Sequence, residues 1–90
     1  MANQEKEKEY YKAVGSVIRS LRQQYTDKSL CMFAYENDIP RSTLSRIEQG
    51  QSECGVVALK KIANGFNWSV SELFAHIESN LGEDFNLIDE

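Results

Sequence analysis

Cysteine and histidine are scarce in this chain of 90 residues, which has two cysteines and one histidine. Cys31 and Cys54 are too few and too far apart in the sequence for a disulfide framework, so we expect both to be free thiols. A zinc site needs more ligands at closer spacing, and His76 has no such neighbours. The composition therefore predicts a protein with no bound metal and no cofactor.

Long apolar runs are also absent. No segment approaches the roughly 18 to 20 apolar residues that a membrane-spanning helix needs. The first nine residues, MANQEKEKE, are charged and lead into no apolar stretch, unlike a secretory signal. We therefore expect a cytoplasmic protein with no membrane partner.

The residue patterns of common enzyme active sites are missing as well. The chain has no glycine-rich phosphate loop, no cluster of metal ligands and no second histidine. A chain of this length forms one domain with a small core, which leaves little material to enclose a catalytic cleft. The sequence therefore predicts a protein that is not an enzyme.

Positive charge is absent from the C-terminal end. The whole chain carries a net charge of −4, but residues 10–71 carry +3 whereas residues 72–90 carry −6 and contain neither lysine nor arginine. The net charge alone argues against a nucleic-acid partner. Because the acidic residues are concentrated in the last part, the middle of the chain stays compatible with one.

Apolar residues recur at helical spacing in five stretches, of which three come before residue 51. The first predicted helix begins at Tyr10, and Gly15 within it indicates close packing against another helix. The second helix follows Ser29, which suits an N-cap. The third runs from Pro40 to Glu48, and Gly50 comes just after its end.

Two further helices complete the predicted fold. Gly55 is expected to start the fourth helix, and Asn67 is expected to end it in a left-handed conformation. Ser69 and Glu72 have the spacing of a capping box that opens the fifth helix. The sequence thus predicts an all-α chain with a flexible N-terminus over 1–9, a helical domain over 10–81 and a tail over 82–90.

The third helix has one polar face that contains no acidic residue. Leu44 and Ile47 form its narrow apolar side. The opposite side carries four residues that can donate hydrogen bonds, Arg41, Ser42, Ser45 and Arg46. Such a helix fits the major groove of B-DNA, where arginine bonds both acceptors of guanine and serine reaches several base edges. It also fits an ordinary solvated surface, because most short amphipathic helices have a polar outer face.

The segment before this helix favours the DNA-binding interpretation. Phe33-Ala34, then Ile39, then the run 41–48 and finally Gly50 follow one another at a characteristic spacing. In these residues the chain resembles the helix-turn-helix family of phage repressors and Cro proteins, often called the xenobiotic-response-element type. The likeness extends from about Ile18 to Phe74.

The resemblance implies a five-helix, lambda-repressor-like domain that binds a double-stranded DNA operator as a homodimer. It implies that base edges are read by Arg41, Ser42, Ser45 and Arg46, and that phosphates are held by Ser29 and Thr43. It also implies a structural ion pair between Arg22 and Glu48, which gives the glutamate a structural role and not a catalytic one.

The chain departs from the family pattern at three places. Leu30 stands where the family usually has a glutamine that contacts DNA, and Glu53 lies in a loop where basic residues are usual. Asp38 stands where glycine is common, and aspartate tolerates the left-handed conformation better than most residues do. The first two departures remove contacts to DNA that the family usually makes.

Two functions from different classes follow. The first is a sequence-specific DNA-binding transcriptional regulator, most simply a homodimeric repressor, whether of the phage, restriction-modification controller or antitoxin kind. The second is a protein-interaction module on the same fold, such as an antitoxin or a partner-binding regulator. The fifth helix and the tail, in which Phe85, Leu87 and Ile88 lie among acidic residues, are the expected contact for a protein partner or a second copy.

Overall fold

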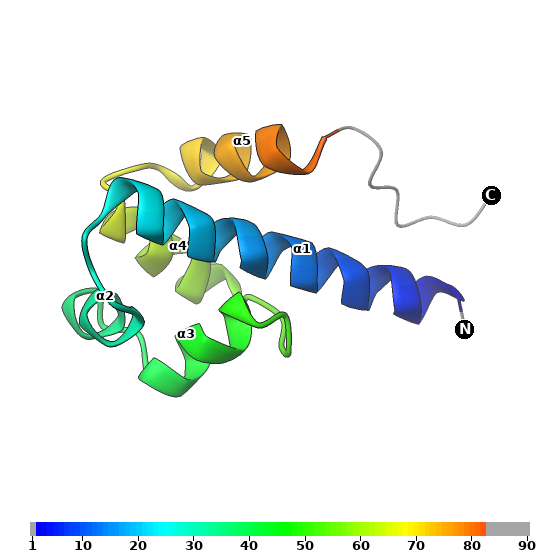
Figure 1. Cartoon of the computed structure of the whole chain (residues 1–90), viewed down its shortest axis with the longest axis horizontal. Coiled ribbons are helices and arrows are strands. Elements are labelled where there is room, and N and C mark those ends of the chain that lie inside the picture. The colour runs from blue at the N-terminus through cyan, green and yellow to red at the C-terminus, as the bar shows by residue number, and fades with distance from the viewer. Residues whose placement is uncertain (1, 83–90) are drawn as a thin grey trace.

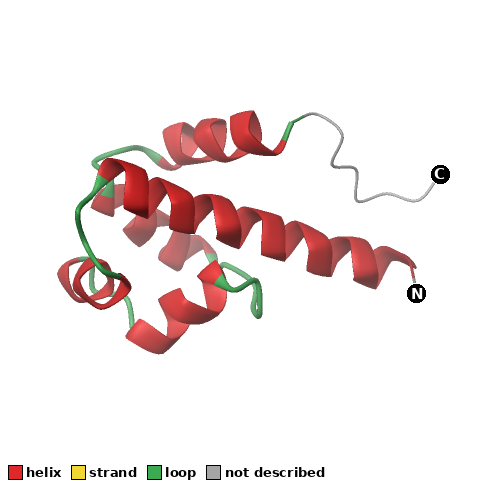
Figure 2. Cartoon of the chain, in the orientation of Figure 1, coloured by secondary structure: helices red, strands yellow, loops and turns green. Residues whose placement is uncertain are grey.

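Residues 2–82, the part of the chain that the computed structural model describes, form five α-helices and no strand (Figures 1 and 2). The helices are α1 (Ala2–Tyr25), α2 (Leu30–Glu36), α3 (Arg41–Glu48), α4 (Val56–Gly65) and α5 (Val70–Leu81). The predicted all-α fold of five helices is confirmed. The predicted tail lies outside the described residues from residue 83 onward.

The first helix is longer than the apolar spacing indicates. α1 begins at Ala2 and not at Tyr10, so the segment predicted as a flexible N-terminus contributes its residues 2–9 to the helix. Glutamate and lysine are good helix formers, and they fill these turns. The apolar spacing gave no signal here because Glu5, Glu7, Lys8 and Glu9 all point to solvent.

α1 is the central element of the molecule. It packs against α3 on one side and α5 on the other, while α2 packs against α3 and α4 against α5 (Figure 1). The core between these helices is made of aliphatic residues with one phenylalanine and two alanines. Its buried members are Val14, Ile18, Leu21, Phe33, Ala34, Ile39, Leu44, Ile47, Ile62, Ala63, Leu73 and Ile77.

Three consecutive helices end in the same way, with a residue in the left-handed conformation. These residues are Asp38 after α2 (φ 55°), Gly50 after α3 (φ 71°) and Asn67 after α4 (φ 62°). In each case the next residue donates its backbone N–H to a carbonyl five residues earlier, which is the pattern of a Schellman motif. The three bonds are Ile39 to Ala34 at 2.9 Å, Gln51 to Arg46 at 2.8 Å and Trp68 to Ala63 at 2.9 Å. The predicted left-handed residues are thus confirmed.

α1 and α3 lie in close contact at Gly15. A Cβ atom at this position would overlap the carbonyl oxygen of Ile47 and come within 2.8 Å of the carbonyl oxygen of Glu48. The predicted close packing at Gly15 is therefore confirmed, and its partner is the last turn of α3. Because both obstacles are backbone atoms, they cannot turn aside as a side chain could.

We predict that Gly15→Ala destabilises the protein although alanine is the better helix former. The added methyl group forces α1 and α3 apart, and overpacking of this kind costs about 1 to 3 kcal/mol. The free energy of unfolding in urea measures the change. Ser16→Ala, at the next and exposed position of α1, is the control and should leave stability within about 0.5 kcal/mol. Equal stability of the two variants would contradict the close contact.

Candidate nucleic-acid interface

The α2–turn–α3 unit is a helix-turn-helix held by contacts at the start of α2 and in the turn. Ser29 caps α2, because its side-chain oxygen accepts a hydrogen bond from the backbone N–H of Met32 at 3.2 Å. In the turn, Ile39 is buried. The ammonium group of Lys61, from α4, donates to the carbonyl oxygen of Asp38 at 2.8 Å. The unit is therefore fixed against the rest of the domain before any partner binds.

α3 places its apolar side chains in the core and its donors outside. Leu44 and Ile47 are buried. Among the predicted contact residues, Arg41, Ser42 and Arg46 are exposed, while Thr43 and Ser45 are half-buried. We call the outward set Arg41, Ser42, Ser45, Arg46 and Gln49 the α3 strip.

Gln49 extends the α3 strip by one turn and was missed in the sequence. It is the C-cap of α3, it is exposed, and its side-chain amide donates to the hydroxyl oxygen of Ser45 at 3.2 Å. Its spacing of four residues after Ser45 would have indicated that it belongs to the same face. An amide side chain both donates and accepts, so it suits contacts to base edges or phosphates.

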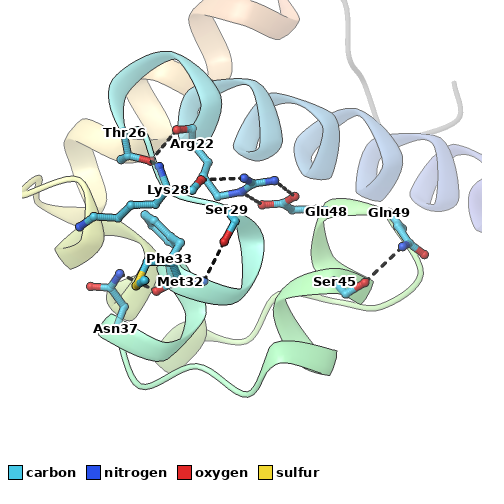
Figure 3. A network of polar contacts seen from close by, with 10 residues as sticks. All are labelled: Arg22, Thr26, Lys28, Ser29, Met32, Phe33, Asn37, Ser45, Glu48 and Gln49. Atoms are coloured by element: carbon cyan, nitrogen blue, oxygen red, sulfur yellow. Dashed lines mark hydrogen bonds and ion pairs between the residues drawn. The ribbon is translucent and has the colours of Figure 1, made fainter.

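Arg22 and Glu48 meet through two parallel hydrogen bonds (Figure 3). Nε of Arg22 lies 2.8 Å from Oε2 of Glu48, and Nη2 lies 2.9 Å from Oε1. Each residue is only 7% exposed. The bonds to Glu48 raise the pKa of Arg22 above its ordinary value. Burial of both groups in this geometry makes the pair a structural element of the domain.

The same guanidinium also holds the connection before α2. Nη1 of Arg22 donates to the backbone carbonyl oxygen of Lys28 at 3.0 Å, immediately before the cap residue Ser29 (Figure 3). One side chain thus joins the end of α1, the start of α2 and the last turn of α3. It also occupies the carboxylate of Glu48, so the acidic residue of α3 faces inward and the α3 strip stays free of negative charge.

The loop after α3 is held against α1. The hydroxyl group of Tyr11 donates to Oε1 of Glu53 at 2.9 Å, and this bond is the main reason that the pKa of Tyr11 is raised. Close by, burial raises the pKa of the Cys54 thiol to about 11. That thiol faces a small apolar cavity of about 100 Å³ lined by α1, α4 and α5. Cys54 therefore stays protonated at neutral pH and acts as a packing residue.

Aromatic rings from the end of α1, from the connection between α4 and α5 and from α5 itself pack together. The rings of Trp68 and His76 are stacked, with centroids 4.0 Å apart, and Tyr25 meets Trp68 edge to face at 5.2 Å. His76 is therefore half-buried against the indole ring. Within the described part of the chain, no group of His, Cys, Asp and Glu is arranged to hold a metal ion. No helix there is long and apolar enough to cross a membrane.

The chain is similar to a control protein of a mycoplasma. It is 39% identical over 64 residues to control protein C.MunI of Mycoplasma sp, and the aligned segment covers 71% of this chain and 86% of that protein. No protein-family model matches the chain.

We predict that Glu48→Ala lowers the free energy of unfolding by about 3 to 5 kcal/mol, because it leaves the guanidinium of Arg22 buried without its partner. Urea unfolding measures the loss. Glu53→Ala, which removes an exposed carboxylate five residues away, is the control and should cost less than about 1 kcal/mol.

The double variant Arg22→Met/Glu48→Leu tests whether the stability is lost because the ion pair is missing or because one buried charge is left without a partner. It removes both charges and should recover much of the stability lost in Glu48→Ala. A Glu48→Ala variant as stable as Glu53→Ala would show that the ion pair contributes nothing to the fold.

Proposed function

This chain belongs to the same family as control protein C.MunI, and from that premise we propose that it is a sequence-specific DNA-binding transcriptional regulator. The observation that carries the proposal is the α3 strip, a row of five hydrogen-bonding side chains of which four are exposed and none is acidic. The relative is named a control protein, and this name favours a regulator over a module that only binds other proteins.

In the proposed complex, α3 lies in the major groove and the α3 strip faces the base edges. Arg41 and Arg46 each have the fork of donors that bonds N7 and O6 of guanine. Ser42 and Ser45 have shorter side chains, which can donate a hydrogen bond to a base edge or accept one from it. An α-helix fits the width of this groove. The burial of Leu44 and Ile47 supports this orientation, because it fixes which side of α3 is turned outward.

Phosphate contacts would fix the position of α3 along the duplex. Ser29 and Thr43 are the proposed side-chain contacts, and the backbone N–H groups of the first turn of α3 would assist them. These N–H groups have no side-chain cap, because the N-cap residue is Pro40. The N-terminal end of a helix favours a negatively charged group such as phosphate.

We further propose that the protein acts as a homodimer, most simply as a repressor that covers a two-fold symmetric operator. The described face of α5 is largely polar, since Ser71, Glu72 and Glu78 are exposed on it. By contrast Val56 and Val57, at the start of the neighbouring α4, are 82% and 68% exposed. Their exposure supports an extension of the dimer contact from α5 to the start of α4, because large aliphatic side chains are usually covered.

We predict that selection from a random duplex pool at moderate salt recovers a two-fold symmetric sequence with the wild type and none with Arg41→Ala/Arg46→Ala. The double variant loses the two guanine-reading forks, each worth roughly 1 to 3 kcal/mol of base discrimination. The single variant Arg46→Ala should recover the same sequence with one position relaxed in each half-site.

The control for this selection is Lys6→Ala/Lys60→Ala, which removes the same charge from residues outside the α3 strip. It should recover the wild-type sequence. A wild-type protein that is folded by circular dichroism yet enriches no sequence would contradict the proposed function and favour the protein-interaction module. Recovery of a single unpaired half-site would contradict the dimer.

A further inference from the structure

Three basic residues form a row along one face of α1. Lys8, Lys12 and Arg19 are four and seven residues apart, so they lie on one side of the helix, and all three are exposed. At 1.5 Å per residue the row spans about 16 Å. We call these three residues the α1 row.

The α1 row borders the same surface as the α3 strip. Arg19 lines a polar hollow of about 340 Å³ between α1 and α3, and Ser45 and Gln49 line it from the other side. Lys8 and Lys12 line a second hollow of about 530 Å³ against residues 50–53, the segment that directly follows α3. The basic row of α1 thus runs beside α3 and continues past its C-terminal end.

Within the described part of the chain, the charges of the α1 row have no acidic partner. Among the described side chains, three other cations have acidic partners, namely Arg22 with Glu48, Lys28 with Glu36 and Lys61 with Asp38. No ion pair among these side chains involves Lys8, Lys12 or Arg19.

Two of the acidic residues near the α1 row already accept hydrogen bonds from other side chains. Glu48 is bound by Arg22, and the carboxylate of Glu53 accepts a hydrogen bond from Tyr11. Glu5 and Glu9, on neighbouring turns of α1, flank the row at its N-terminal end. Acidic side chains on α1 therefore lie closer to the N-terminal end of the row than to Arg19, which lies next to α3.

We infer that Lys8, Lys12 and Arg19 bind phosphates of one DNA strand beside the major groove that α3 enters. The inference rests on the proposed function, because it places α3 on duplex DNA. A row of about 16 Å matches some five base pairs at 3.4 Å per phosphate along the axis. The inference also explains how a chain of net charge −4 binds a polyanion, because the positive charges are gathered on the face that meets the duplex.

Neither the loop after α3 nor the first turn of α2 has a basic side chain that could bind these phosphates in place of α1. Residues 51–53 contain no basic residue, and Glu53 is negative. Lys8 and Lys12 stand over that segment. At the start of α2, the side chain of Leu30 cannot hydrogen-bond a phosphate, and Arg19 lines the hollow that Leu30 borders. α1 thus supplies positive charge at two places where the helix-turn-helix unit itself has none.

The test is the salt dependence of binding to the duplex recovered by selection. Lys8→Gln/Lys12→Gln/Arg19→Gln is compared with the wild type and with Lys6→Gln/Lys60→Gln, which loses two charges elsewhere and leaves the contact of Lys61 with the turn intact. Each lost phosphate contact lowers the slope of log Kobs against log salt by about 0.9. We expect the α1 variant to lower the slope by about 2 to 3, and the control variant to lower it by less than about 1. Melting curves show that both variants are folded.

The selected sequence provides a second readout. The α1 variant should bind more weakly at every salt concentration and recover the same base sequence, because phosphate contacts carry no base information. A slope change per removed charge that is no larger in the α1 variant than in the control variant would overturn the inference and leave the proposed function intact. Failure of the wild type to bind any duplex would overturn both.

Discussion

The two hydrogen bonds between Arg22 and Glu48 are the constraint on which the rest of the structure depends. They join the end of α1 to the last turn of α3, and a third bond from the same guanidinium holds the carbonyl group just before α2. Because both charged groups are buried, neither can leave the other without a large loss of stability. The orientation of α3 relative to α1 follows from this pair together with the close contact at Gly15.

The pair also determines the charge of the outer surface. Glu48 is the one acidic residue of α3, and its carboxylate is turned inward to Arg22. The exposed side of α3 is left with arginine, serine and glutamine, and the neighbouring face of α1 adds exposed lysine and arginine side chains. A protein with a net negative charge thereby presents a surface that attracts a polyanion.

Helix order, caps and left-handed turn residues were predictable from the sequence because they depend on local chemistry. Asp38, Asn67 and the capping box of Ser69 and Glu72 are examples. The start of α1 was not, because its first turns are solvated and carry no apolar spacing. Gln49 could have been found from its spacing of four residues after Ser45. The α1 row could not, because its place beside α3 depends on how two helices distant in sequence pack together, and no local pattern records that packing.

Methylation interference on the selected duplex tests most directly whether α3 reads DNA through the major groove. A methyl group on guanine N7 lies in the major groove, whereas one on adenine N3 lies in the minor groove. Our account predicts that N7 methylation blocks binding at guanines in two symmetric half-sites and that N3 methylation does not. Interference from N3 methylation alone would contradict major-groove reading by α3.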